Sequence, residues 1–217
     1  MARIGLVHAL RDSMPPVDAA FAAHWPQALV THLFDGSLYL DRSRGTAGPS
    51  EIDRRIAELL RYSASTGAEA ILFTGSFFGA AVEKGRQGLG VPALTSYEAL
   101  VEAAFSMGRR FALLSTARDS APLLHADLER YARANGLTFT ATEHVVEGAL
   151  DALLDDDAAR HDELIASAAA EVPQCDAVLL AQFSMARAKA LAAQRSGGRV
   201  LTAPETAVLK LRRMLQG

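Results

Sequence analysis

Short apolar segments alternate with segments of helical periodicity along the whole chain. The apolar runs of strand length are residues 4–7, 28–33, 70–73 and 93–94 in the first half and 111–114, 137–142, 177–180 and 200–201 in the second. Nearly continuous apolar strands between helices are typical of parallel sheets that are covered on both faces. The pattern predicts an α/β fold in which each half forms a parallel sheet of about four strands flanked by helices.

Start and stop signals for helices fill the gaps between these runs. Ser50 and Asp53 fit a capping box, ahead of apolar residues at helical spacing. Ser120, with a proline two residues later, predicts a helix that ends near Gly136, and the three aspartates at 155–157 predict the start of another. A stretch rich in Gly, Ser, Arg and charge, residues 41–49, predicts a mobile loop.

The chain repeats itself at one spacing in three places. Residues 3–15 resemble 110–122 around Arg-Asp-Ser, 70–76 resemble 177–183, and 94–98 resemble 201–205 in Leu-Thr-x-x-Glu, each pair 107 residues apart. This period is too long for a solenoid and predicts two similar lobes related by a pseudo-twofold axis. We expect the first lobe to hold residues 1–97 and 204–217, and the second 98–203, with a ligand cleft between them.

Composition removes several classes of function. The net charge is −3 and both signs are mixed along the chain, which indicates neither a nucleic-acid surface nor an anionic-membrane surface. No apolar run approaches the roughly 18 residues of a membrane span, and the amino-terminal residues have no signal-peptide anatomy. A single cysteine cannot form an internal disulfide, so we expect a cytoplasmic protein.

All three repeats lie where a strand is predicted to end and a helix to begin, which is where parallel sheets bind ligands. Their Asp-Ser and Thr-x-x-Glu pairs also fit ordinary helix-start chemistry. Residues 73–79, Phe-Thr-Gly-Ser-Phe-Phe-Gly, offer backbone N–H groups and the Ser76 hydroxyl to a carboxylate or an enolate oxygen. This segment is not a Walker loop or a dinucleotide fingerprint, and a tight turn without a ligand is the alternative.

The order of these motifs resembles the aspartate/glutamate/hydantoin racemase superfamily, which includes arylmalonate decarboxylase and maleate isomerase. The resemblance covers essentially the whole chain and rests on Thr-Gly-Ser-x-x-Gly, Val-Pro at 91–92, Leu-Leu-Ser-Thr at 113–116 and Val-Leu-Leu-Ala-Gln-Phe-Ser at 178–184. The resemblance implies an active site like that of the family's racemases, in which two cysteine thiols, one from each lobe, face each other across the substrate α-carbon. The matching positions are Gly75 and Gln182, so both thiols are absent. Glycine at position 75 resembles arylmalonate decarboxylase, in which glycine replaces the first thiol. Gln182 differs from that enzyme, which keeps the second cysteine as its proton donor.

Other residues at strand ends are candidates to replace the thiols. His8 follows the first strand and its imidazole titrates near neutrality, with a structural hydrogen-bonding role as the alternative. Arg118 can bind a carboxylate with both arms of its guanidinium or pair with a nearby aspartate on the surface. The other substrate-binding candidates are Ser76, Thr95, Thr116, Ala117, Phe183, Ser184 and Thr202. We expect Gly75, Ser76, Thr116 and Ala117 to form the floor of an anion pocket.

Two classes of function stay open. The first is an enzyme that acts on a small carboxylic or keto acid, by proton transfer, isomerisation or decarboxylation, without the cysteine pair and without a cofactor. The second is a non-catalytic protein of the racemase fold that binds such a ligand, inactivated by glycine at position 75. The hydroxyls and Arg118 favour the enzyme. The histidines are scattered, so no metal is expected; Cys175 is expected to be structural, and a homodimer stays open.

Overall fold

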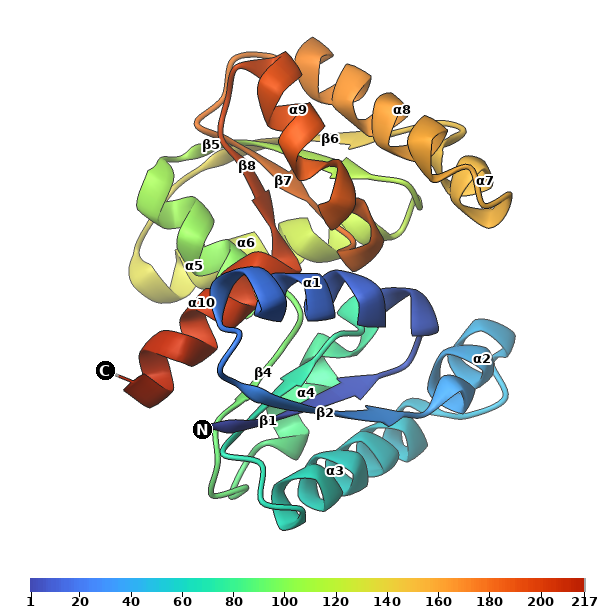
Figure 1. Ribbon diagram of the computed structural model, residues 1–217, viewed down its shortest axis with the longest axis vertical. Helices are drawn as coiled ribbons and strands as arrows, with labels where there is room; N and C mark the ends of the chain where they lie inside the picture. The colour runs from blue at the N-terminus through green and yellow to red at the C-terminus, as the bar shows by residue number, and fades with distance from the viewer. Residues whose placement is uncertain (217) are drawn as a thin grey trace. The chain divides into compact units, whose positions relative to one another are not determined.

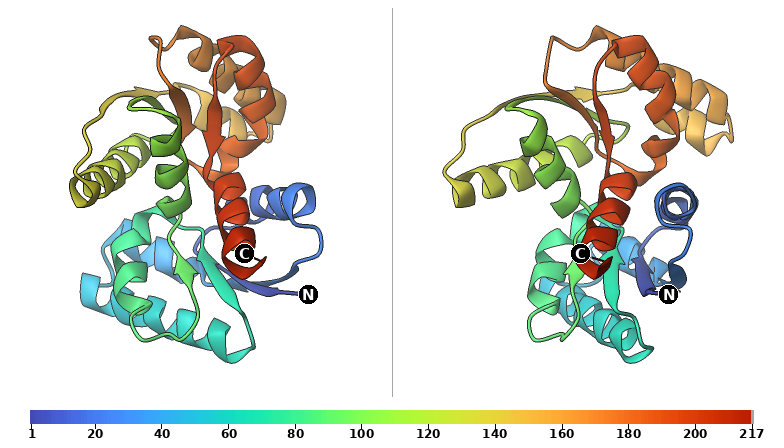
Figure 2. Two further views of the ribbon diagram at one scale, coloured as in Figure 1. Left: turned by 90° about the vertical axis from the view of Figure 1, so that its left-hand side faces the viewer. Right: turned by 60° about the vertical axis from the view of Figure 1, so that its left-hand side comes forward.

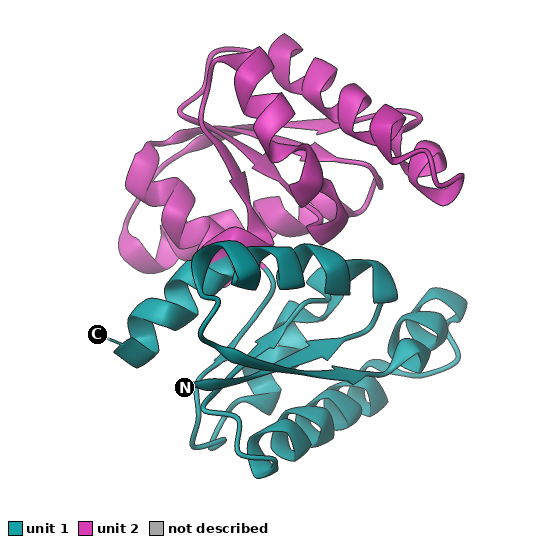
Figure 3. Cartoon of the chain, in the orientation of Figure 1, with its two compact units in different colours: residues 1–96, 207–217 teal, residues 97–206 magenta. Residues whose placement is uncertain are grey.

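The computed structural model describes residues 1–216, which divide into two compact units. The first unit comprises residues 1–96 and 207–217, and the second comprises residues 97–206 (Figure 3). Each unit contains one four-stranded parallel sheet with helices packed against it (Figure 1). This confirms the α/β class and the two parallel sheets predicted from the apolar pattern.

The sheet of the first unit has the strand order β2-β1-β3-β4. Its strands are β1 (Arg3–His8), β2 (Leu29–Phe34), β3 (Ala70–Phe73) and β4 (Ala93–Leu94). Its helices are η1 (Arg11–Ser13), α1 (Met14–His24), α2 (Gly36–Arg44), α3 (Pro49–Ser65), η2 (Ser76–Phe78) and α4 (Gly79–Gly85), and α10 (Ala203–Gln216) enters it from the second unit. Helices α1 and α3 lie on opposite sides of the sheet (Figure 1), so β3 is buried along its whole length.

The sheet of the second unit has the strand order β6-β5-β7-β8. Its strands are β5 (Arg110–Ser115), β6 (Thr140–Val145), β7 (Ala177–Leu180) and β8 (Val200–Thr202). Its helices are α5 (Glu98–Met107), α6 (Ser120–Asn135), α7 (Ala149–Leu154), α8 (Ala158–Glu171), η3 (Phe183–Ala188) and α9 (Lys189–Ser196). Helices α5 and α6 cover one face of this sheet, and α8 and α9 the other (Figure 2). In the described part of the chain, no helix is long and apolar enough to span a membrane.

The two sheets repeat one another in order and in spacing. Strands β1 and β5 begin 107 residues apart, as do β3 and β7, and β4 and β8. Strands β2 and β6 begin 111 residues apart, and the intervening helix is 16 residues long in the second unit but 11 in the first. The internal repeat in the sequence therefore corresponds to a repeated sheet.

An acidic side chain anchors the first residue of the central strand in both units. Glu69 accepts a hydrogen bond from the backbone N–H of Arg3 at 2.9 Å, and Asp176 accepts one from the backbone N–H of Arg110, also at 2.9 Å. The Arg110 guanidinium, helped by two backbone N–H groups, lowers the pKa of Asp176 to about 2. The repeat thus extends to side chains that begin the strands.

The second strand of each unit begins later than predicted, by one residue in the first unit and by three in the second. The Leu137 N–H donates to the carbonyl of Ala132 at 2.9 Å, which makes Leu137 part of the end of α6. The ring of Phe139 packs edge-on against that of Phe105, with 5.6 Å between centroids. These apolar residues cover helices, so the prediction that they belong to the strand was wrong.

Two of the three predicted helix starts are confirmed. Helix α6 begins at Ser120 and ends at Asn135, followed by the capping residue Gly136 with a φ of 64°. Asp157 caps α8 by accepting a backbone N–H at 3.0 Å. The capping box at Ser50 is wrong, because α3 begins at Pro49 and its N-cap, Gly48, has no side chain to donate or accept. Proline is favoured in the first turn, where its missing N–H costs nothing.

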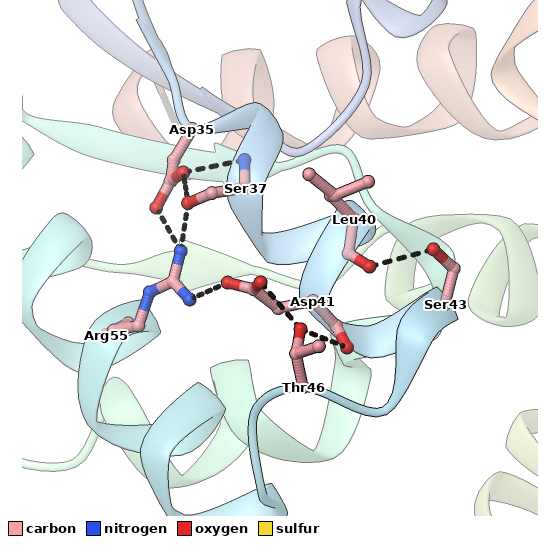
Figure 4. Close-up of polar contacts among 7 residues, drawn as sticks. All are labelled: Asp35, Ser37, Leu40, Asp41, Ser43, Thr46 and Arg55. Atoms are coloured by element: carbon pink, nitrogen blue, oxygen red, sulfur yellow. Dashed lines mark hydrogen bonds and ion pairs between the residues drawn. The ribbon is translucent and has the colours of Figure 1, made fainter.

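The predicted mobile loop over residues 41–49 is wrong in its first part, because α2 continues to Arg44. Arg55 of α3 donates to Asp35 at 3.0 Å and to Asp41 at 2.7 Å, and it also contacts Ser37 (Figure 4). Asp35 caps α2 through the backbone N–H of Ser37 at 2.9 Å. Desolvation opposes the shift, but the hydrogen bonds from Ser37 and Arg55 together lower the pKa of Asp35. Of the charges that suggested a loop, Asp41 is paired with Arg55, and this pair fastens α2 to α3.

Candidate active site

The carboxyl edge of the first sheet collects the strand-end residues of this unit. His8 is the last residue of β1, residues 74–76 follow β3, and Thr95 follows β4. The N–H of Thr74 donates to the carbonyl of Val7 at 3.0 Å, so the parallel pairing continues past the end of β3. Because parallel strands all end at one edge, the structure brings His8 and residues 74–76 together.

His8 is fully buried and hydrogen-bonded through both ring nitrogens. Its Nδ1 lies 2.9 Å from Thr74 Oγ1 and 3.1 Å from Ser13 Oγ. The two hydroxyl oxygens are 2.8 Å apart, and Ser13 also donates to the carbonyl of Leu10 at 2.7 Å. Ser13 therefore uses its hydroxyl in this cluster and makes no side-chain capping bond at the start of α1, contrary to the helix-start interpretation.

The other nitrogen of His8 leads towards the surface. Its Nε2 lies 3.0 Å from Nδ1 of His32 on β2, and the two rings stack with 5.2 Å between centroids. The Nε2 of His32 lies 3.2 Å from Asp18 Oδ1 on α1, with side-chain exposures of 33% and 52%. Sequence reasoning treated His32 as one of several scattered histidines and missed Asp18, because residues this far apart in the chain share no local motif.

Burial governs the charge of His8. Removal of the ring from water, followed in importance by the charge of the neighbouring His32, lowers the pKa of His8 from 6.5 to about 4. At neutral pH the His8 ring is therefore uncharged, with one nitrogen as a donor and the other as an acceptor.

Gly75 is required by space and not by backbone angle. Its φ of −90° and ψ of 106° are open to any residue. A Cβ atom at this position would lie 2.8 Å from the ring of Phe73 and 2.9 Å from the ring of Phe78. These two rings pack edge to face, 5.7 Å apart, and occupy the room that a side chain at position 75 would need.

The residues after Gly75 form the η2 turn, which α2 flanks. The ring of Tyr39 lies 6.0 Å from that of Phe77, and the Arg42 guanidinium lies 4.3 Å from the Phe77 centroid. Ser76 is half-buried, and its hydroxyl bonds to no other residue within 1–216. The aromatic and cationic contacts hold the turn, while the Ser76 hydroxyl keeps its hydrogen-bonding capacity.

In the second unit, Gln182 and Thr116 bind one another reciprocally. The backbone N–H of Thr116 donates to Gln182 Oε1 at 2.6 Å, and Gln182 Nε2 donates to Thr116 Oγ1 at 2.9 Å. Gln182 follows β7 and Thr116 follows β5, so these two predicted site residues lie together at the edge of one sheet. The backbone N–H fixes which end of the amide carries the oxygen.

Two further residues of the second unit flank this pair. The Tyr97 hydroxyl donates to the carbonyl of Ala181, the residue before Gln182. The Ser115 hydroxyl, one residue before Thr116, is fully buried and has no hydrogen-bond partner among the described residues. The sequence placed Tyr97 in a repeat but indicated no role for its hydroxyl.

The remaining predicted site residues differ widely in exposure. Thr95, Thr202 and Phe183 are buried, whereas Ser184 and Ala117 are half-buried. The Arg118 side chain is 85% exposed, 3.6 Å from Glu147, so its nearest charge is a glutamate and not the aspartate considered from sequence.

The predictions that join residues of different lobes, Gly75 facing Gln182 and a pocket floor that spans both lobes, stay predictions. Cys175 is half-buried beside the amino end of β7, whereas Gln182 follows its carboxyl end, and burial raises the pKa of this thiol. Across residues 1–216, no three His, Cys, Asp or Glu side chains gather as a metal ion would need.

Comparisons with known proteins agree with the fold. The family model described as Asp/Glu/Hydantoin racemase matches residues 12–211, and no curated protein matches the chain in sequence. The structure is similar to allantoin racemase from Klebsiella pneumoniae, with a TM-score of 0.71, 15% identity, and coverage of 100% of this chain and 88% of that one. The similarity to arylmalonate decarboxylase has a TM-score of 0.69 and 19% identity, and it covers 99% of this chain and 93% of that one. The similarity to glutamate racemase from Francisella tularensis subsp. tularensis SCHU S4, in complex with D-glutamate, has a TM-score of 0.68 and 11% identity. It covers 99% of this chain and 81% of that one.

Proposed function

Because this chain belongs to the Asp/Glu/hydantoin racemase family, we propose that it is an enzyme that transfers a proton at the carbon next to the carboxylate of a small acid. The reaction is a racemisation, an isomerisation or a decarboxylation and uses no cofactor. Such chemistry requires a group that accepts or donates the proton, and hydrogen-bond donors for the charge that develops on the carboxylate or enolate oxygens.

The observation that carries the proposal is the donor pattern of the Gln182–Thr116 pair. Gln182 uses its oxygen and one amide hydrogen within the pair, while Thr116 uses its backbone N–H and one oxygen lone pair. The second amide hydrogen of Gln182 and the hydroxyl hydrogen of Thr116 stay available to donate. Two fixed donors side by side suit a carboxylate or an enolate oxygen.

The first unit has hydrogen-bond donors of its own at the carboxyl edge of its sheet. In this proposal the Ser76 hydroxyl and the backbone N–H groups at the start of η2 bind a carboxylate oxygen. Neither cysteine position carries a thiol, so the group that moves the proton is a different one. We assign this role to the cluster of His8, Ser13 and Thr74, in which buried His8 acts through the hydroxyls.

The proposal is tested by proton exchange in D2O. The protein is incubated with the two enantiomers of glutamate and of aspartate and with arylmalonates, and loss of the Cα–H signal or release of CO2 is followed by NMR. We expect at least one acid to exchange or decarboxylate. For that acid, Ser76→Ala should lower the rate or the affinity at least tenfold, about 1.4 kcal/mol, and leave the unfolding temperature unchanged.

Ser106→Ala is the matched control, because the exposed Ser106 hydroxyl bonds only to the carbonyl of Ala103 in α5. An acid that binds without exchange would establish the non-catalytic alternative instead. If no acid of the panel binds or reacts, the proposed substrate class is wrong.

A further inference from the structure

A continuous chain of polar contacts in the first unit, with an ion-pair contact between Asp18 and His32 and hydrogen bonds from His32 inwards, runs from the surface to the carboxyl edge of the sheet. It passes from Asp18 through His32 and His8 to the hydroxyls of Ser13 and Thr74, and every link is 3.2 Å or shorter. We propose that Asp18, His32 and His8 form a proton relay between solvent and these two buried hydroxyls. Its inner end lies one residue before Gly75 in the chain.

Counting hydrogens shows that the chain has two complete arrangements. In the first, His32 is neutral and donates from Nε2 to Asp18, while His8 donates from Nε2 to His32 and accepts a hydroxyl hydrogen at Nδ1. In the second, His32 is protonated on both nitrogens and donates to Asp18 and to His8. His8 is again neutral but now donates from Nδ1 to Thr74.

The second arrangement satisfies three of the inner contacts in a single direction, with the longer contact of 3.1 Å between His8 Nδ1 and Ser13 Oγ left aside. His8 donates to Thr74, Thr74 donates to Ser13 at 2.8 Å, and Ser13 donates to the carbonyl of Leu10 at 2.7 Å. In the first arrangement the two hydroxyls have one hydrogen too few for these same contacts. A proton on His32 therefore reverses the hydrogen bonds as far as Thr74 without placing a charge on buried His8.

The groups around these contacts favour a positive charge on His32 over one on His8. Asp18, from α1, is the acidic group in contact with it within residues 1–216, and both side chains reach solvent. His8 itself is fully buried, and desolvation together with His32 lowers its pKa to about 4. A cation on the neighbouring η1, Arg11, lies over the Phe34 ring at the end of β2, 5.3 Å from its centroid.

The use of this relay in turnover rests on the proposed function. A proton that arrives at the hydroxyl pair forms a new O–H bond, and the displaced hydroxyl hydrogen forms the Nδ1–H bond of His8. The Nε2–H bond of His8 breaks, and the Nδ1–H bond of His32 forms. The positive charge comes to lie beside the Asp18 carboxylate, and the return of the proton reverses each step. Asp18, His32 and His8 are thus positioning residues.

Long-range ¹H–¹⁵N NMR of the histidine rings tests the relay in the protein alone. As the pH is lowered, His8 should change from the Nε2–H to the Nδ1–H form, while it stays neutral, together with the gain of a proton by His32. A merely structural hydrogen bond would leave His8 in one form throughout. If His8 keeps one form, or changes independently of His32, the relay is overturned.

Variants sharpen the test. His32→Gln should abolish the change at His8. Asp18→Asn removes the countercharge of the protonated His32 at a half-exposed position and should move the change at His8 to lower pH, without unfolding the protein. His144→Gln is the control, because His144 bonds only to Thr142 on β6 and should leave His8 as it is.

The relay and the proposed function fail separately. A coupled change at His8 in a protein that reacts with no acid would support the relay and remove the proposed function. Turnover with His8 in one fixed form would support the proposed function and overturn the relay. If both hold, Asp18→Asn should shift the pH profile of the rate in the same direction as the NMR change.

Discussion

The two units carry different chemistry on the same backbone. The equivalent strand-end positions, 107 residues apart, are occupied by His8 and Ser115, by Thr74 and Ala181, and by Gly75 and Gln182. The first unit has a titratable, hydrogen-bonded cluster at this edge. The second has uncharged hydrogen-bond donors and a buried hydroxyl without a partner among the described residues.

The backbone hydrogen bonds at these positions are nearly identical. The N–H of Thr74 lies 3.0 Å from the carbonyl of Val7, and the equivalent N–H of Ala181 lies 2.9 Å from that of Leu114. The turns that follow are closed by equivalent bonds of 3.2 Å and 3.1 Å, to the carbonyls of Gly75 and Gln182. The difference between the units therefore comes from side chains placed on a common frame, and substitutions at these positions can test it.

The largest expected effect is the pH dependence of stability that His8 causes. The unfolded ring binds a proton below pH 6.5, whereas the folded ring does so only near pH 4, so stability is fully present above pH 6.5 and falls as the pH is lowered. The loss between pH 7 and pH 4 should be roughly 3 kcal/mol. His8→Asn should lack this part of the dependence, as measured by urea unfolding at several pH values.

The control for this measurement is His144→Asn, a substitution on the half-exposed strand β6 of the second unit, which should retain the pH dependence of the parent. An unchanged pH dependence in His8→Asn would mean that the folded His8 titrates as it does in the unfolded chain. The two units would then not differ through a titratable group.

Gly75→Ala should destabilise the first unit by about 2 kcal/mol, because its Cβ would meet the rings of Phe73 and Phe78. Gly79→Ala is the matched control at the start of α4, because its added Cβ would meet no atom within 4 Å outside its chain neighbours and its own helix backbone. This variant should stabilise by about 0.5 kcal/mol. Thermal unfolding measures both. Equal stability of the two variants would show that the rings yield freely and that glycine is not required by space.

The smallest effect, opposite in sign between the units, is expected for two buried hydroxyls. Thr74→Val removes a hydroxyl that bonds to His8 and Ser13 and should destabilise by about 1 kcal/mol. Ser115→Ala removes a buried hydroxyl that has no partner among the described residues and should be neutral or stabilise by up to about 1 kcal/mol. Denaturant unfolding compares the two. A loss of stability in Ser115→Ala would indicate that this hydroxyl is satisfied in solution.

Much of the fold was predictable because it depends on local pattern. Strand β3 was located to the residue, and the helix that Gly136 caps was recognised by this glycine. The errors arose where apolar or charged residues find partners distant in the chain. Phe139 was assigned to a strand but packs on Phe105, and Asp41 was assigned to a loop but binds Arg55. Pattern alone does not reveal these partners.

The candidate site divides in the same way. The repeat located His8, Gly75, Thr116 and Gln182 at strand ends, because the order of strands and turns is written in the sequence. It did not reveal the pairing of Gln182 with Thr116, which depends on two neighbouring strands ending at one edge.

By itself the sequence determined the α/β class, the duplication and the residues that stand where strands become helices, since apolar periodicity and turn chemistry act over a few neighbouring positions. Only the tertiary structure decided which of them meet. It brought His32, which is 24 residues from His8 in the chain, into contact with the His8 ring, and Asp18, which is 10 residues away, into contact with His32. It also filled the space beside Gly75 with two phenyl rings. Hydrogen-bond distance, burial and steric room are properties of neighbours in space, which register and packing create.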